Sequence, residues 1–320
     1  MVLIWGIPSE SPIQRLLDEL DTLDQPYLAV SQRHFAETNL HLTVDASGTL
    51  GGELAYQQRT YPLDAFTGVY LRLTDENTLP EYRCLAADDP LRTHAHQLIQ
   101  SLTLWTEWSG CRTVNKLSAM ASNNSKPYQA QFIRQCGFLT PDTLITNEPA
   151  EVTAFCQQHN DRIIYKSISG VRSIVQTWQA NGDADKLALV RHCPVQFQRQ
   201  VEGFDVRVHV IGELCIATRI TAQATDYRYA LQQTGESAQL SPYELDDDLS
   251  ARCVDLSRTL DLDFSGIDLR IAPNGSVYCF EVNPCPAYTY YESHTGQPIA
   301  ARLAEYLSGH DNYYRRVWQL

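Results

Sequence analysis

The sequence FSGIDLRIAPNGSVYCFEVNPCPAYTYY, from Phe264 to Tyr291, decides how this chain folds. It predicts two β-strands joined by a turn over residues 272–276, because Pro, Asn, Gly and Ser gather there between two alternating segments. Each strand has one apolar face: Ile267, Leu269 and Ile271 on the first, and Tyr278, Phe280 and Val282 on the second. Since both apolar rows meet the same core, the parity of the pairing is fixed.

The register that follows brings two carboxylates together. It pairs Ile271 with Tyr278, Leu269 with Phe280 and Ile267 with Val282. Asp268 then lies opposite Glu281, with Asn283 beside them. Like charges across a ladder repel, and a divalent cation removes the conflict. Carboxylate and amide oxygens suit Mg²⁺, so the pattern predicts a magnesium site. The alternative is a solvated polar face on an edge hairpin.

Three motifs at this end of the chain resemble the ATP-grasp superfamily: GIDLR at 266–270, FEVNP at 280–284 and TGQPIA at 295–300. The RimK-like branch, which joins glutamate to a protein C-terminus and is related to glutathione synthetase, is the most similar. The resemblance implies an α/β (α+β) protein with the ATP-grasp fold. An N-terminal open α/β domain would precede two α+β subdomains that clasp ATP.

The resemblance also implies the cofactors. These are ATP and two Mg²⁺ ions, for which Mn²⁺ could substitute. In the family, matching Asp, Glu and Asn side chains hold the metal ions that bridge the ATP phosphates. The implied metal ligands here are Asp268, Glu281 and Asn283.

Length and composition set the outer limits. The chain has 320 residues, enough for two or three domains. Its net charge is −13, and no basic stripe of the kind that binds nucleic acid is present. The start MVLIWGIPSE lacks a basic region, and no apolar run reaches about 20 residues, so neither a signal peptide nor a membrane span is expected. The nine cysteines form no CxxC pair and are expected to be free buried thiols in a cytoplasmic protein.

The predicted domains are residues 1–111, 112–193 and 194–320. Strands alternate with helices in the first, which favours an open α/β domain. The expected elements there are strands at 2–5, 27–30 and 69–73, a small hairpin within 39–62, and helices capped by Ser11 and over 90–108. This segment has no GxGxxG, so dinucleotide binding is not predicted.

A polar loop with Ser169, Gly170 and Arg172 follows Lys166 in the middle segment. Backbone N–H groups, hydroxyls and a lysine can cover phosphates, although a lysine at a strand end is more often simply solvated. By resemblance, Lys126 and Lys166 match the two family lysines that contact ATP. The family loop is richer in Gly, so either Arg172 adds a phosphate contact or the loop is stiffer here.

The segment Gln198, Arg199, Gln200 and Val201 occupies the place where the family holds adenine, mainly through backbone groups. Relatives often have Glu where Arg199 stands, so the resemblance supports backbone contacts more than a side-chain contact at this position.

Three arginines are predicted at the reacting end of the cleft. Arg207 shares a strand face with Asp205 and His209, and the alternative for Arg207 is an exposed ion pair with Asp205. Arg228, in Asp226-Tyr227-Arg228, resembles the family arginine near the transferred phosphate, although Ala230 replaces an Asn that follows it. Arg270 lies two residues from Asp268 and is expected to bind the substrate carboxylate; the alternative is that it balances a metal-free acid. His209 is expected to be a hydrogen-bonded sheet histidine.

These residues together predict an ATP-dependent ligase that joins a carboxylate to an amine through an acyl phosphate. The alternatives are a kinase with the same fold and a nucleotide-binding protein without turnover. Expected partners are small-molecule or peptide substrates, with no nucleic acid and no membrane, and a homo-oligomer is conceivable. Tyr288, Tyr290 and Tyr291 either pack under the C-terminal helix or form a substrate wall.

Overall fold

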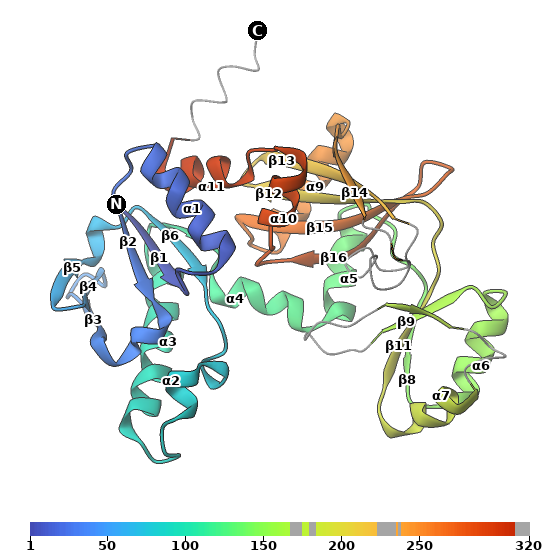
Figure 1. Ribbon diagram of the computed structural model, residues 1–320, viewed down its shortest axis with the longest axis horizontal. Coiled ribbons are helices and arrows are strands. Elements are labelled where there is room, and N and C mark those ends of the chain that lie inside the picture. The colour runs from blue at the N-terminus through green and yellow to red at the C-terminus, as the bar shows by residue number, and fades with distance from the viewer. Residues whose placement is uncertain (167–174, 179–183, 223–234, 236–237, 311–320) are drawn as a thin grey trace, which may run out of the picture.

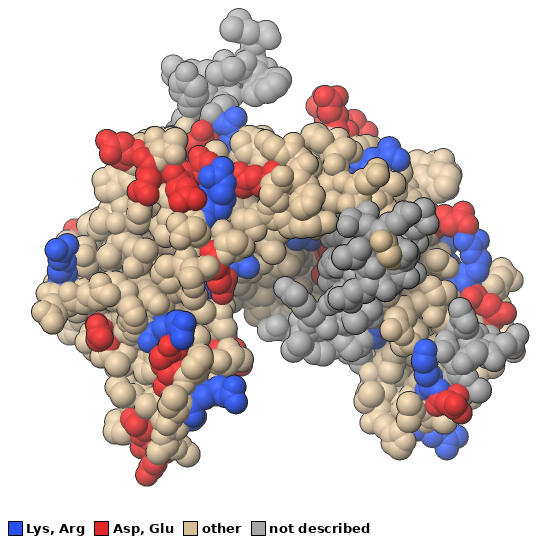
Figure 2. Space-filling model, viewed as in Figure 1, with Lys and Arg blue, Asp and Glu red and all other residues tan. Residues whose placement is uncertain are grey.

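The computed structural model describes residues 1–166, 175–178, 184–222, 235 and 238–310 (Figure 1). An N-terminal part lies at one end, a large sheet and a small sheet lie at the other, and α4 (Leu117–Met120) leads from the first to the second. Figure 2 shows the molecule hollowed between the N-terminal part and the small sheet. The Ser169, Gly170, Arg172 and Arg228 predictions lie outside the described residues.

The N-terminal part is built on a parallel sheet with the order β2-β1-β6-β7. Its strands are β1 (Val2–Gly6), β2 (Tyr27–Ser31), β6 (Gly68–Arg72) and β7 (Arg112–Val114). Alternate residues of β1 bury on opposite faces, which is why VLIW is apolar throughout. One face packs on α1 (Ser11–Thr22) and α11 (Ile299–Ser308), and the other on α3 (Pro90–Trp108).

Two sequence predictions about this part need correction. Ser11 is the first residue of α1 rather than its cap, because Glu10 holds the cap position and gives no side-chain hydrogen bond. The expected small hairpin is a three-stranded antiparallel sheet of β3 (Thr38–Val44), β4 (Leu50–Tyr56) and β5 (Arg59–Pro62). The shorter elements nearby are η1 (Gln32–Glu37), η2 (Leu63–Ala65), η3 (Glu76–Thr78) and α2 (Pro80–Arg83).

The small sheet has the order β10-β9-β11-β8. Its strands are β8 (Thr143–Thr146), β9 (Ile163–Lys166), β10 (Gln176–Thr177) and β11 (Val195–Arg199). Beside them lie α6 (Pro149–Gln158), α7 (Ala184–Leu189) and η5 (Val190–His192). Phe197 and Trp178 lie at the centre of the apolar cluster that joins sheet and helices.

The large sheet has the order β14-β13-β12-β15-β16 and is antiparallel. Its strands are β12 (Phe204–Ile211), β13 (Leu214–Thr221), β14 (Gln239–Tyr243), β15 (Phe264–Ile271) and β16 (Val277–Asn283). One face packs on α5 (Lys126–Gln135) and α9 (Asp247–Thr259). The remaining elements are η4 (Ala121–Asn124) and α10 (Thr289–Thr295).

The pairing of β15 with β16 follows the predicted register only in part. Ile267 lies opposite Val282 and Asp268 opposite Glu281, as predicted. A β-bulge then shifts the register, so Leu269 lies opposite Cys279 and Arg270 opposite Tyr278. The predicted pairs beyond Asp268 are therefore wrong, because simple alternation cannot show that Phe280 is an extra residue in the ladder. As a result, Cys279 joins the core in place of Tyr278.

Each predicted domain boundary precedes a strand that pairs with the sheet before it. β7 starts at Arg112 and pairs with β6, and β11 starts at Val195 and pairs with β8 and β9. The division into residues 1–111, 112–193 and 194–320 stays a prediction.

All nine cysteines lie in the described residues and are free thiols. Only three of them are buried, so the expectation of buried thiols holds for Cys156, Cys253 and Cys279. Among the described helices, none is long and apolar enough to cross a membrane.

Candidate functional site

The polar face of the large sheet changes character along β12 and β15. Ile211 and Phe264, at one end, are opposite each other and buried. Toward the other end the opposite pairs become His209 with Gly266, Arg207 with Asp268, and Asp205 with Arg270. Tyr288, Tyr291 on α10 and the α11 stripe cover the apolar end, and the Tyr291 ring lies 5.7 Å from the Arg207 guanidinium carbon. The charged end is therefore the part of this face that can receive a ligand.

One line across three strands carries three of the predicted residues. Arg207 on β12 lies opposite Asp268 on β15, which lies opposite Glu281 on β16. Nη1 of Arg207 donates to Oδ1 of Asp268 over 2.6 Å. The Arg207 side chain is only 6% exposed, whereas that of Asp268 is 26% exposed. This line of Arg207, Asp268 and Glu281 is called the charged rung below.

Lys126 brings a second cation to the charged rung from helix α5. Its Nζ donates to Oε2 of Glu281 over 2.5 Å. Three residues along the same helix face, Gln129 donates to the Val282 carbonyl over 2.7 Å and accepts from the Val282 N–H over 2.8 Å. α5 starts here because Ser125 caps it through the Tyr128 N–H and Pro127 follows in its first turn. The cap thus fixes where the lysine meets the carboxylate.

The charge of Glu281 is set by the cations around it. Burial by itself raises the pKa of the Glu281 carboxyl, but the Lys126 ammonium, followed by Lys166 and Arg207, outweighs burial and holds that pKa below its usual value. Glu281 is therefore an anion at neutral pH. Because Lys166, at the end of β9, is 7% exposed and acts on Glu281, the small sheet contributes to the same site.

The oxygen donors at the rung fit a magnesium ion. Asp268 and Glu281 face each other across the ladder, and Asn283 is two residues from Glu281 on the same strand. The Asn283 Oδ1 accepts from the Cys285 N–H over 2.9 Å, and an amide oxygen has a second lone pair. The described residues contain no cluster of three His, Cys, Asp or Glu that could hold a metal. Amide, water and phosphate oxygens would therefore have to complete the shell, as is usual for Mg²⁺.

Arg270 has a different environment from the one expected. Its Nε and Nη2 donate to the two carboxylate oxygens of Asp205 over 2.7 and 2.8 Å. Its Nη1 donates to the Val201 carbonyl over 3.0 Å. The planar fork is already matched by a carboxylate of the protein itself, and the expected alternative of balancing Asp268 or Glu281 is not what the structure shows. The role of Arg270 in binding the substrate carboxylate stays a prediction.

The four predicted adenine-binding residues lie at the end of β11 and just beyond it. Gln198 is buried and donates to Oγ1 of Thr143 over 2.9 Å. The N–H groups of Arg199 and Gln200 donate to the carbonyls of Asp142 and Arg162. The Val201 carbonyl accepts from Arg270, as described above. Several polar groups of this segment are therefore engaged within the protein.

Arg199 links this segment to the large sheet. Its Nη2 donates to the Tyr278 hydroxyl over 3.0 Å, and its guanidinium lies 5.6 Å from the centre of the Tyr278 ring. The bulge in β16 makes this possible, because it turns Tyr278 to the face that carries Arg270. The sequence pattern placed Tyr278 on the apolar face of β16, so it did not predict this contact.

His209 differs from its prediction. Its ring is fully buried, and neither ring nitrogen has a hydrogen-bond partner among the described residues. Burial, and then the nearby Arg207 charge, lower the pKa of His209 well below its usual value, so the imidazole is neutral. It packs against Phe264 and against the edge of Tyr291 instead.

The tyrosines after the hairpin differ in their burial and in their contacts. Tyr288 and Tyr291 are buried in the cluster that contains α11, and the Tyr288 hydroxyl donates to the Pro12 carbonyl. Tyr290 is 40% exposed. Packing accounts for Tyr288, whereas the Tyr291 ring also lies 5.7 Å from the Arg207 guanidinium carbon.

Two residues that the sequence analysis missed hold the loop after β16. Asn115 donates to the Phe264 and Pro284 carbonyls, both over 2.6 Å, and accepts from the Phe264 N–H. Arg72, at the end of β6, pairs with Glu10 over 2.8 Å and donates to the Cys285 sulfur over 3.0 Å. The available signal was a polar residue directly after a buried strand for Asn115, and a charged residue at the end of one for Arg72. The N-terminal sheet thereby holds the loop that directly follows Asn283.

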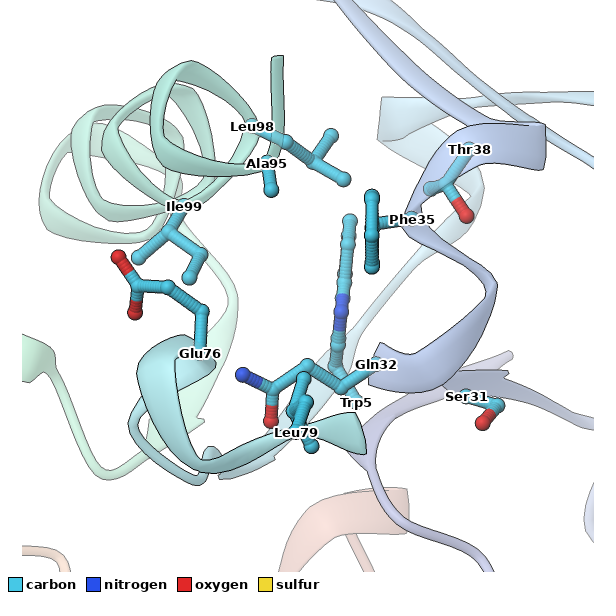
Figure 3. A pocket seen from close by; sticks show the side chains of 10 residues that line it. All are labelled: Trp5, Ser31, Gln32, Phe35, Thr38, Glu76, Leu79, Ala95, Leu98 and Ile99. Carbon is cyan, nitrogen blue, oxygen red and sulfur yellow. The ribbon is translucent and has the colours of Figure 1, made fainter. Parts of the chain in front are cut away.

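A separate pocket lies in the N-terminal part, between α3, η1 and η3 (Figure 3). Its lining comprises Trp5, Ser31, Gln32, Phe35, Thr38, Glu76, Leu79, Ala95, Leu98 and Ile99. The Gln32 amide donates to the Thr74 carbonyl over 2.5 Å and accepts from the Thr74 N–H over 2.8 Å. Most of the apolar lining belongs to the cluster on the α3 face of the sheet, away from α1 and α11. This pocket is therefore not part of the charged rung.

Comparison with known families decides the affiliation of the chain. A family model described as the RimK-like ATP-grasp domain matches residues 123–307, more than half of the chain. The chain belongs to the RimK-like ATP-grasp family. The matched segment contains Lys126, Lys166, Arg207 and the hairpin of β15 and β16, and it ends at the last residue of the α11 apolar stripe.

A curated relative from Salmonella paratyphi B, ribosomal protein bS6–L-glutamate ligase, is 28% identical over 216 residues, which are 64% of this chain and 70% of the relative. Solved structures extend the similarity to the whole fold. The ATP-grasp ligase PsnB, complexed with a phosphomimetic variant of its minimal precursor, Mg and ADP, has a TM-score of 0.77 at 23% identity, covering 97% of this chain and 98% of that one.

Two further structures resemble the chain as closely. A Chryseobacterium gregarium RiPP-associated ATP-grasp ligase with ADP and a leader and core peptide has a TM-score of 0.79 at 20% identity, covering 96% of both chains. The macrocyclase MdnC from Microcystis aeruginosa MRC, bound to precursor peptide MdnA, has a TM-score of 0.77 at 21% identity, covering 97% of this chain and 99% of that one. The predicted family, the ATP-grasp fold and the class of ATP-dependent ligases are confirmed.

Proposed function

We propose that this protein uses ATP and Mg²⁺ to activate a carboxylate of a peptide or protein as an acyl phosphate and joins it to an amine. The γ-phosphoryl group passes from ATP to the carboxylate oxygen, which releases ADP. The amine then attacks the acyl carbon, phosphate leaves, and an amide forms. The observation that carries this proposal is the charged rung with Lys126, which combines hard oxygen donors with fixed cations.

Each part of the site has a separate task. Asp268, Glu281 and Asn283 would hold Mg²⁺, which supplies neutralising charge to the phosphates when bound. Lys126 and Lys166 bind the phosphates and orient the γ-phosphoryl group. Ser169, Gly170 and Arg172, outside the described residues, would cover it. The segment Gln198 to Val201 would receive adenine, mainly through backbone groups.

The arginines divide between chemistry and support. Arg207 stabilises the negative charge on the transferring phosphoryl group, and Arg228, outside the described residues, is assigned the same role by its motif. Arg270 supports the site by joining β15 to the Val201 carbonyl and to Asp205. The site uses no Ser or Cys nucleophile, because positioning and electrostatic stabilisation suffice for this transfer.

The choice of a peptide or protein substrate rests on the relatives. The curated relative is named as a ligase of a ribosomal protein and L-glutamate. Two solved neighbours are complexes with peptides, a leader and core peptide in one and a precursor peptide in the other. ADP and Mg in a neighbouring structure support the same cofactors here. A cytoplasmic location and a homo-oligomer remain part of the proposal.

The test is a substrate screen with purified protein, ATP and Mg²⁺. Amino acids and acidic peptides are offered singly and in pairs, ADP release is measured, and products are weighed by mass spectrometry. We expect ADP release that depends on both an acid and an amine, with a product that has lost one water. A stable phosphorylated product without an amide would identify a kinase. If no pair of substrates gave ADP release, the ligase reaction would be contradicted. When Glu281 is replaced by Gln to test the metal site, Glu213→Gln is the matched control, because it removes a carboxylate from an exposed ion pair with Arg258.

A further inference from the structure

Gly266 lies beside the charged rung, one position along β15 from the pair of Arg207 and Asp268. It is opposite His209 on β12 and opposite Asn283 on β16. A Cβ atom at this position would lie 2.1 Å from Nη2, 2.5 Å from Cζ and 2.8 Å from Nε of Arg207. The guanidinium therefore lies flat against the strand where the glycine has no side chain.

Backbone conformation does not explain this glycine. Gly266 is absent from the described glycines with positive φ, so another residue could adopt its backbone angles. It lies inside a strand, where glycine weakens the ladder and commonly marks a close approach of another group. The close approach here is the Arg207 side chain.

The other sides of the guanidinium are also defined. Asp268 accepts from Nη1 over 2.6 Å, and the Tyr291 ring centre lies 5.7 Å from Cζ. Arg207 as a whole is 5% exposed. Tyr291 is itself held by the buried His209 ring, 4.9 Å away. The Arg207 guanidinium is thus enclosed by the Asp268 carboxylate, the Tyr291 ring and the backbone at Gly266. Together these three groups leave it one orientation.

We infer that Gly266 is a positioning residue, which sets the orientation of Arg207 by leaving room for its guanidinium between Tyr291 and Asp268. This inference rests on the proposed role of Arg207 at the transferring phosphoryl group. Any side chain at position 266 displaces the fork from Asp268 and from the reacting atoms. A displacement of about 1 Å in such a site can cost about 100-fold in rate.

A stability cycle tests the packing without any ligand. The free energy of unfolding is measured for the wild type, Gly266→Ala, Arg207→Ala and the double variant. We expect Gly266→Ala to destabilise the wild type clearly and to cost almost nothing once Arg207→Ala has emptied the space. If Gly266→Ala itself does not fold, the double variant should fold; an equal cost in both backgrounds, or a double variant that does not fold, overturns the inference.

The kinetic arm separates positioning from general loss of structure. Gly266→Ala should lower kcat about 100-fold, with a much smaller change in the KM for Mg·ATP, because the phosphate and adenine contacts remain. The control is Gly51→Ala on β4, which also lacks a positive φ and whose Cβ would meet only Oγ1 of Thr43 at 3.3 Å. We expect its kcat to be unchanged.

The same measurements distinguish this inference from the proposed function. A Gly266→Ala enzyme with nearly wild-type kcat overturns the positioning role, whatever the role of Arg207. Full turnover by Arg207→Ala overturns the role of Arg207 and the positioning role with it. Absence of ligase activity in the wild type overturns the proposed function, and the stability cycle then shows only whether the two residues pack as described.

Discussion

Two arginine–carboxylate pairs lie on neighbouring positions of the same two strands, yet they differ in what they can do. Arg270 on β15 meets both oxygens of Asp205 on β12 and also the Val201 carbonyl. Arg207 on β12 meets one oxygen of Asp268 on β15. The first pair uses both carboxylate oxygens internally, whereas the second holds its carboxylate next to another acid.

The third strand accounts for the difference. On β16, Glu281 lies opposite Asp268, and Tyr278 lies opposite Arg270. The second carboxylate places hard oxygen ligands on both sides of the ladder, where a metal ion can meet them, and Lys126 offsets the charge of Glu281. A tyrosine beside an ion pair adds no charge. We therefore propose that the same kind of cross-strand pair is structural at one position and functional at the next, and substitutions can test each side.

The largest effect is expected from Glu281→Gln, which removes the feature that distinguishes the rung. The variant keeps the shape of the side chain but withdraws one charge from the metal site and leaves Lys126 without its anion. We expect a loss of about 100-fold or more in turnover, measured by ADP release, with a folded protein by circular dichroism. Near-wild-type turnover in a normally melting variant would show that the hairpin is not the metal site.

The next effect is expected from Lys166→Met, which removes a charge from the small-sheet side of the rung and retains most of the side-chain length. Lys166 is buried and acts on Glu281, so its ammonium is placed for the phosphates. ATP affinity should fall by about 1.5–3 kcal/mol, the strength of a hydrogen bond to a charged group. Calorimetry measures this directly, and unchanged affinity would remove Lys166 from the nucleotide site.

A moderate effect is expected from Arg270→Lys, which breaks the two-bond ion pair of Arg270 with Asp205. A lysine cannot reproduce the two parallel bonds to Asp205 together with the bond to Val201. We expect a loss of about 1–2 kcal/mol in the free energy of unfolding, and weaker Mg·ATP binding through the displaced Val201 segment, with the apparent affinity for the acid unchanged. Selective loss of acid affinity would restore the sequence-based assignment of Arg270 to the substrate carboxylate.

The smallest effect is expected at an ion pair outside this face. Arg258 donates to Glu213 over 2.7 Å, and both side chains are 57% exposed. Glu213→Gln should change the free energy of unfolding by at most about 1 kcal/mol and leave turnover unaffected, since exposed pairs are screened by water and salt. Chemical denaturation and the ADP assay check both; a large loss in either would mean that charge pairs matter here regardless of their location.

Much of the site could be predicted from local pattern. Alternation placed Asp268 opposite Glu281 and put Arg207 on the polar face of its own strand, because residues two apart on a strand share a side and the core fixes which side that is. The helix from Pro90 to Trp108 was also predicted to the residue. These features depend on residues close together in the chain.

The register error and the unpredicted side-chain contacts have a common cause in contacts between distant segments. The bulge at Phe280 depends on how β16 fits β15, and it moves Tyr278 toward Arg199 on another sheet. Arg270 donates to Asp205, 65 residues away in the sequence. Asn115 donates to the carbonyls of Phe264 and Pro284, which are also distant in the sequence. A strand pattern gives the face of a side chain but not the partner that reaches it.

The sequence by itself determined the family, the hairpin and the acids on it, since motifs, turn chemistry and period-two alternation are local properties of the chain. Only the tertiary structure decided which cation pairs with which acid: Arg207 with Asp268, Lys126 with Glu281 and Arg270 with Asp205. It also decided that Gly266 makes room for Arg207. The physical reason is that these choices depend on side-chain reach and space between β12, β15, β16 and α5, which exist only once the segments have packed together.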